Sequence, residues 1–230
     1  MIIRKIKGIL IVFSICGLFA ALAFQSGHRL QTIETNAGDI RFILDAGHGN
    51  PDGGAVGIDK TTTEADLNLA ITKKISAILM QKKINHILTR SDAESIYSTG
   101  DTIHEKKVSD VRNRIQIASQ TPETPLISIH LNSYPDSSVH GIQVFYGNGQ
   151  EAQTLALKMQ KAINEEIQPN HTKVIKELSK NIYLFSHIDN PILLIECGFL
   201  SNSEELQKLK SEDYQTEIAS VIAEVLSKQS

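Results

Sequence analysis

From residue 38 onward, short apolar runs alternate with longer segments whose apolar residues recur at the spacing of a helix. Such alternation predicts a single α/β domain, in which a largely parallel or mixed central sheet carries helices on both faces. The strands expected from the apolar runs are 40–44, 84–89, 126–130, 141–146, 181–185 and 192–196. The expected helices are 63–83, 108–119, 150–167 and one from about residue 211, with 91–107 as a surface loop.

The N-terminal segment, residues 1–24, differs from the rest of the chain. Its first seven residues carry basic but no acidic side chains, and residues 8–24 form an uninterrupted apolar run. This order is typical of a secretory signal peptide, for which Ala21 and Ala23 supply the small residues of a cleavage site. The run is also just long enough for an uncleaved membrane anchor, so both interpretations stay open. On either interpretation the rest of the chain is exported, to the cell-wall side of the membrane.

A polar linker, 25–38, separates this segment from the folded domain, 39–230. The net charge of −3 argues against a nucleic-acid partner, which requires a basic surface. We expect contact with the membrane only through the N-terminal segment. Cys16 lies within the apolar run, so Cys197 is alone in the exported part and has no intrachain disulfide partner there.

Polar residues end three of the predicted strands. The first strand runs into Asp45 and the glycine-flanked His48, the third ends on His130, and the last ends on Glu196. Ligands of such sheets bind beyond the carboxyl ends of the strands, so we expect these residues to meet at one edge. Glu64, in the first turn of the next helix, adds a carboxylate, although the helix dipole alone would also favour it there.

Two imidazoles and one carboxylate form a ligand set of catalytic zinc that leaves a coordination position for water. His48, Glu64 and His130 are therefore the expected ligands of one zinc ion, with Glu196 as a base that is not a ligand. The glycines around His48 allow its loop to approach the metal and the substrate closely. This set predicts metal-assisted hydrolysis of an amide or an ester.

Four stretches resemble the zinc-dependent N-acetylmuramoyl-L-alanine amidases in order and spacing, and the resemblance runs from Arg41 to the C-terminus. They are ILDAGHGNPDGGAVG, TEADLNLAI, ISIHLNS and ILLIECGFLSNSEE. The resemblance implies that 39–230 is the catalytic domain, with zinc on the two histidines and Glu64 and with Glu196 as the base. It also implies peptidoglycan as the substrate, cleaved between N-acetylmuramic acid and the L-alanine of the stem peptide.

The compact single domain and the sequence SIHLN are most similar to those of the germination-specific, spore-cortex amidases. This similarity implies a role in cortex maturation, on the way to muramic δ-lactam. We find no wall-binding repeat, and the connection between His130 and Gly141 is too short for an inhibitory helix, so an uncovered site is expected. A role in the vegetative wall, the need for a helper protein and the oligomeric state stay open.

Two other functions fit parts of the pattern. A zinc carboxypeptidase that shortens stem peptides would use the same metal chemistry. A non-catalytic wall-binding module could be built on a degenerate amidase, but such proteins usually lose a ligand or the base. This chain retains all four residues, which favours an enzyme.

Neighbouring polar residues receive lesser roles. Asn132 is a candidate substrate-binding residue or a turn cap, and Asn68, one turn after Glu64, is a candidate support for that carboxylate. Asp45 is expected to brace the His48 loop and not to bind the metal.

The remaining candidates are expected to be structural. Cys197 is interpreted as a small buried hydrophobic residue and not as a nucleophile. His140 and His187 are expected in loops, where they could also line the substrate groove. The helix that contains Arg112 and Arg114 resembles a family helix that is mainly structural.

Overall fold

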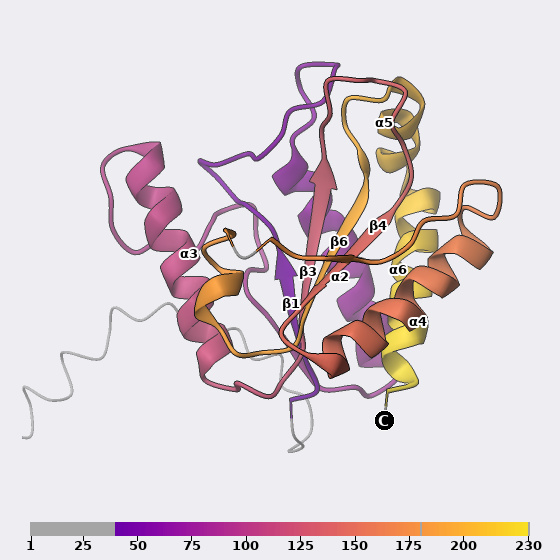
Figure 1. The fold of residues 1–230 in the computed structure, drawn as a ribbon. Coiled ribbons are helices and arrows are strands. Elements are labelled where there is room, and N and C mark those ends of the chain that lie inside the picture. The colour runs from indigo at the N-terminus through magenta and orange to yellow at the C-terminus, as the bar shows by residue number, and fades with distance from the viewer. Residues whose placement is uncertain (1–39, 180, 230) are drawn as a thin grey trace, which may run out of the picture.

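The computed structural model describes residues 40–179 and 181–229 (Figure 1). The N-terminal segment predicted to be a signal peptide or an anchor, and the linker after it, lie outside these residues. In the described part of the chain, no helix combines the length and the apolar character needed to cross a bilayer.

The described residues form one six-stranded mixed sheet, with the strand order β2-β1-β3-β6-β4-β5. The neighbouring pairs β2–β1, β1–β3 and β3–β6 are parallel, whereas β4 runs antiparallel to β6 and parallel to β5. The mixed sheet predicted from the sequence is therefore confirmed. The strands are β1 (Phe42–Ala46), β2 (His86–Leu88), β3 (Leu126–Asn132), β4 (Gln143–Gly147), β5 (Lys176–Glu177) and β6 (Ile192–Phe199).

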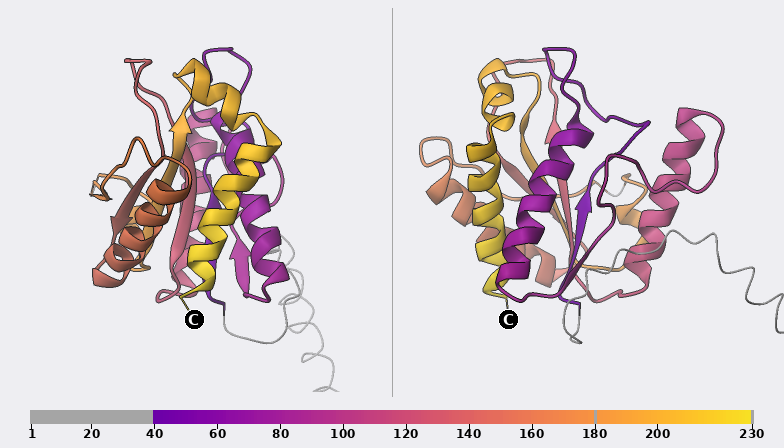
Figure 2. Two further views of the ribbon diagram at one scale, coloured as in Figure 1. Left: turned by 90° about the vertical axis from the view of Figure 1, so that its right-hand side faces the viewer. Right: turned by 180° about the vertical axis from the view of Figure 1, so that it is seen from behind.

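Helices cover both faces of the sheet, as the alternation predicts. Three of them, α2 (Glu64–Gln81), α4 (Gln150–Glu166) and α6 (Glu212–Ser227), lie side by side on one face (Figure 2). The opposite face carries α3 (Ile103–Ser119) and the segment around a short 3-10 helix, η1 (Phe185–His187). A further short helix, α5 (Ser203–Leu209), follows the carboxyl end of β6.

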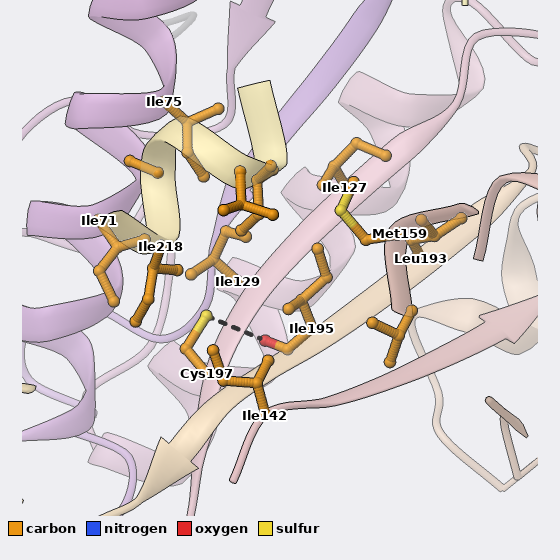
Figure 3. Packing of buried hydrophobic residues seen from close by; sticks show 14 of the residues in the cluster. Ile71, Ile75, Ile127, Ile129, Ile142, Met159, Leu193, Ile195, Cys197 and Ile218 are labelled. Atoms are coloured by element: carbon orange, nitrogen blue, oxygen red, sulfur yellow. Dashed lines mark hydrogen bonds between the residues drawn. The ribbon is translucent and has the colours of Figure 1, made fainter. Parts of the chain in front are cut away.

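The larger core lies between the sheet and the three-helix face (Figure 3). Isoleucines from α2 and α6 pack there against Ile129 of β3 and Ile195 of β6. Cys197 is fully buried in the same core, and its Sγ lies 3.7 Å from the carbonyl oxygen of Ile195. The prediction that this cysteine is a buried small hydrophobic residue is confirmed, and burial also raises the pKa of its thiol.

The first residue of a helix could be predicted from the sequence for α2 but not for α3. Thr63 caps α2, because its side chain accepts a hydrogen bond from the Asp66 backbone, and the start predicted for this helix is confirmed. The start predicted for α3, at residue 108, is wrong because the helix begins at Ile103. Thr102 and Glu105 form a reciprocal capping box there. The first turns of α3 are largely exposed, so they carry no apolar periodicity.

The strand predicted at 181–185 is wrong. This segment forms turns that lead into η1, and Leu184 and Phe185 pack into the smaller core on the α3 face. The apolar side chains are therefore buried by a folded-back loop and not by a strand. The edge position next to β4 is taken by β5, a two-residue strand that no sequence pattern indicated. The helix α5 was also not expected, and Asn202 caps its start.

Candidate metal centre

The loop after β1 places His48 next to the carboxyl ends of β1 and β3. The backbone of His48 has a φ of 62°, a left-handed conformation that is uncommon for residues other than glycine. The preceding Gly47 packs directly on the His130 ring, since a Cβ atom at Gly47 would lie 2.3 Å from His130 Nε2. Glycine is therefore required at position 47 for the two histidines to approach each other, and their ring centroids are 5.1 Å apart.

Glu64 lies between the two imidazoles. Its Oε1 is 2.8 Å from His130 Nδ1, and its Oε2 is 3.3 Å from His48 Nε2. The carboxylate is buried and also accepts hydrogen bonds from the backbone N–H groups of Ala55 and Leu131. Ligand atoms of His48, Glu64 and His130 all lie within 4.8 Å of one another. The structure thus brings together the three residues predicted from the sequence.

The surroundings of His48 and Glu64 favour the charged form of each side chain. Burial opposes the charged form of His48, but hydrogen bonds to Asp52 and Glu64 outweigh it and raise its pKa to about 9. Burial likewise opposes ionisation of Glu64, yet the two imidazoles hold its pKa well below its usual range. A buried carboxylate that faces ring nitrogens of two histidines fits a divalent metal ion with nitrogen and oxygen ligands.

Glu196 lies beside this group without belonging to it. It is the residue of β6 paired in register with His130 of β3, so both side chains emerge on the same face of the sheet. Its Oε2 atom is buried and has no hydrogen-bond partner among the described residues. Burial, helped by the negative charge of Glu64, raises the pKa of Glu196 to about 7. A carboxyl group with this pKa can exchange a proton near neutral pH.

The predicted supporting residues lie where the sequence indicated. Asn68 donates hydrogen bonds to the carbonyl of Gly47, at 3.1 Å, and to Glu64 Oε1, at 3.4 Å. Asp45 is buried beneath the His48 loop and accepts hydrogen bonds from two hydroxyl groups. Burial opposes its ionisation, but its ion pair with Arg114 lowers its pKa to about 2. Both residues brace the group and neither is one of its three candidate ligands.

The other candidates take structural places. Asn132 accepts a hydrogen bond from the backbone N–H of Ser133, the next residue, and its substrate-binding role stays a prediction. His140 is an exposed loop residue that stacks on His171. His187 is also exposed, but it is the last residue of η1 and not a loop residue as expected, and it stacks on Tyr183.

Arg112 and Arg114 lie on α3, as expected. Arg112 is exposed, whereas Arg114 is buried and donates to the carbonyl of His48 at 2.6 Å.

Two residues at the site were not predicted. Asp52 contacts the His48 ring on the side away from Glu64, with its Oδ2 atom 3.0 Å from Nδ1 of the ring. The same oxygen atom forms an ion pair with Lys107 Nζ at 2.9 Å. Arg90 is buried and donates to the backbone around the candidate ligands. The sequence did contain a signal for Arg90, because this residue follows the apolar run of β2 just as Asp45 follows the apolar run of β1. A carboxylate four residues after a loop histidine carries no comparable signal.

Comparison with known proteins connects this geometry to a family. A family profile described as N-acetylmuramoyl-L-alanine amidase matches residues 42–228. The chain is 34% identical over 183 residues to the germination-specific N-acetylmuramoyl-L-alanine amidase of Bacillus subtilis, covering 79% of this chain and 76% of the relative.

Solved structures agree with the profile. The CwlD amidase of Clostridioides difficile, solved in complex with the GerS lipoprotein, superposes with a TM-score of 0.78 at 36% identity, over 83% of this chain and 98% of that one. The catalytic domain of CwlV, an amidase of Bacillus (Paenibacillus) polymyxa, gives a TM-score of 0.66 at 29% identity, over 83% and 97% of the two chains.

Proposed function

Because the chain belongs to the N-acetylmuramoyl-L-alanine amidase family, we propose that it is a zinc hydrolase of peptidoglycan. Its zinc ion is held by His48, Glu64 and His130, and its substrate bond joins N-acetylmuramic acid to the L-alanine of the stem peptide. The observation that carries this proposal is the convergence of these three side chains beside Glu196, whose buried Oε2 has no hydrogen-bond partner in the part of the chain that the structure describes.

The roles of the side chains follow from their contacts. The nitrogen atoms that face Glu64, Nε2 of His48 and Nδ1 of His130, are the candidate ligand atoms. Zinc, when bound, supplies Lewis-acid chemistry, in which water is acidified and a carbonyl group is polarised. Asp52 keeps the His48 ring in the orientation that directs Nε2 at Glu64.

Glu196 acts as the general base and then as the general acid. Its Oε2 accepts a proton from the attacking water and delivers it to the nitrogen of L-alanine as the C–N bond breaks. Its pKa of about 7 suits both transfers, since the group can hold or release the proton near neutral pH. Glu64 is unsuited to this role because both of its oxygen atoms are already engaged.

The biological setting is proposed from the relatives. The similarity to a germination-specific amidase and to CwlD supports a role in spore-cortex maturation, through muramic δ-lactam. Such a substrate lies outside the cytoplasmic membrane, which agrees with export directed by the N-terminal segment. We also propose that a partner protein assists the enzyme, since CwlD was solved with the GerS lipoprotein.

Digestion of purified peptidoglycan tests the reaction, with the products identified by mass spectrometry. An amidase releases intact stem peptides that begin with L-alanine and leaves N-acetylmuramic acid with a free lactyl carboxylate. Shortened stems on intact muramoyl amides would instead identify a carboxypeptidase. Binding to the wall without hydrolysis, in a zinc-loaded sample, would identify a non-catalytic module.

A further inference from the structure

Arg90 is a buried guanidinium group that donates to backbone carbonyl groups. It follows β2, and only 4% of the residue is exposed. Its Nε donates to the carbonyl of Ala46 at 2.9 Å, and its Nη2 donates to Gly47 at 3.2 Å and to Ala65 at 2.8 Å. Its Nη1 donates to Asp92, in its own loop, at 2.8 Å. A buried charge is costly unless it is well hydrogen-bonded, so the arrangement of these carbonyl groups is tightly coupled to Arg90.

These carbonyl groups belong to the segments that carry the candidate ligands. Ala46 and Gly47 immediately precede His48, and Ala65 immediately follows Glu64. Gly47 is also the residue on which the His130 ring packs. One side chain therefore ties the loop after β1 to the first turn of α2, and through Gly47 it fixes the surface against which His130 rests.

Arg114 shares one acceptor with Arg90, the carbonyl of Ala46, and otherwise makes different contacts. It pairs with the carboxylates of Asp45 and Asp110 and donates to the carbonyl of His48. It braces the loop after β1, whereas Arg90 alone of the two arginines donates to α2, the helix that carries Glu64. Asn68 of α2 also donates to the carbonyl of Gly47, so Arg90 acts beside it, but Arg114 duplicates neither contact with α2.

We propose that Arg90 is a positioning residue of the metal centre, one that sets the spacing of the loop after β1 and the start of α2 for zinc binding. This inference rests on the proposed function. The planar fork of arginine can serve three carbonyl groups in two segments at once, whereas the three N–H donors of a lysine ammonium share one nitrogen atom. Arg90→Lys therefore keeps the positive charge but cannot make the same set of hydrogen bonds to both segments.

The test compares zinc affinity and stability in two variants of the full protein. Zinc affinity is measured by competition with a chelator, and the Tm is measured without metal. Asn190→Ala is the matched control, because Asn190 is also fully buried and donates to three carbonyl groups, but it precedes the opposite end of β6. We expect Arg90→Lys to weaken zinc binding by about 10–100-fold. Asn190→Ala should lower the Tm and leave zinc affinity unchanged.

The outcomes separate the inference from the proposed function. Failure of the wild-type protein to bind zinc would overturn the proposed function, and the inference with it. Wild-type zinc affinity in Arg90→Lys, at a Tm lowered as in Asn190→Ala, would overturn the inference alone. If Arg90→Lys does not fold, the same measurement is made on Arg90→Gln, which retains two N–H donors. Loss of the fold in both variants would also overturn the inference, because Arg90 would then hold the fold and not the ligands.

Discussion

The two faces of strands β3 and β6 differ sharply at their carboxyl ends. On the three-helix face, Ile129, Ile195 and Cys197 are fully buried in the larger core. On the α3 face, the same two strands begin with Leu126 and Ile192, which are buried, but carry His130 and Glu196, which are only partly buried, nearer their carboxyl ends. Adjacent residues of one strand therefore alternate between packing in the larger core and facing the candidate metal centre.

The difference follows from the strand period. Side chains alternate between the faces, so a polar residue at the end of a strand interrupts one core and leaves the other intact. Glu196 and Cys197 are adjacent in the chain, yet only Glu196 faces the two histidines. Burial raises the pKa of each, to about 7 for the carboxyl group and far above neutral pH for the thiol. Near neutral pH only the carboxyl group exchanges its proton, and the predictions below test this contrast.

The largest effect is expected from Glu196→Gln. Loss of the base should lower the rate of amide hydrolysis by about 10²–10⁴-fold, the usual contribution of general acid–base catalysis. The amide side chain has nearly the same shape, so the fold should be retained. Release of stem peptides from peptidoglycan measures the rate, and a circular dichroism spectrum checks the fold. Full activity in this variant would remove Glu196 from the mechanism.

A smaller loss is expected from Gly47→Ala. Its new Cβ would lie 2.3 Å from the His130 ring, so the ring must move, and displacement on this scale costs about 10²-fold in rate. Gly53→Ala, in the same loop, is the control because its Cβ would meet nothing closer than 3.4 Å. The rate of stem-peptide release is measured for both variants under the same conditions. Equal rates would show that the contact between Gly47 and His130 is unimportant.

The raised pKa of Glu196 also predicts a pH-dependent stability in the metal-free protein. Between its ordinary value of 4.5 and about 7, the native state retains a proton that the unfolded state has lost. This contribution to stability is therefore lost as the pH rises through that window. Glu196→Gln does not titrate, so its Tm relative to wild type should be higher at pH 8 than at pH 5, by roughly 5 °C. The same difference in Tm at both pH values would contradict the raised pKa.

The smallest effect is expected from Cys197→Ala. Removing the buried sulfur should lower the free energy of unfolding by about 1 kcal/mol, as for other small truncations in a core. Hydrolysis should stay close to the wild-type rate, because the thiol faces away from the histidines. Thermal melts and rate measurements on one preparation give both values. Lost activity in a folded, zinc-loaded variant would place this thiol in the chemistry.

Most of the sheet and the main site residues could be predicted from the sequence. Apolar runs that end in His130 and Glu196 mark buried strands that reach a common edge, and the structure pairs these two residues in register. Glu64 was found because a helix start beside a glycine-rich loop is a local feature. These features could be predicted because each is set by a short stretch of sequence, and the strands and the helix form at those stretches in the folded protein.

Other features depend on packing that no local pattern encodes. Residues 181–185 have the apolar content of a strand, but they fold back as a loop over the smaller core. The exposed first turn of α3 has no apolar face, so only its capping box marks it. Arg90 becomes informative only when the carbonyl groups of two separate segments are seen to converge on it.

The zinc content of purified protein tests the central claim most directly. We predict one zinc ion per chain in the wild type and in Glu196→Gln, and none in His130→Ala, after dialysis against metal-free buffer and elemental analysis. This result would place His130 among the ligands and Glu196 outside them. Zinc retained by a folded His130→Ala, or lost from a folded Glu196→Gln, would contradict the assignment of His130 as a ligand and of Glu196 as the base.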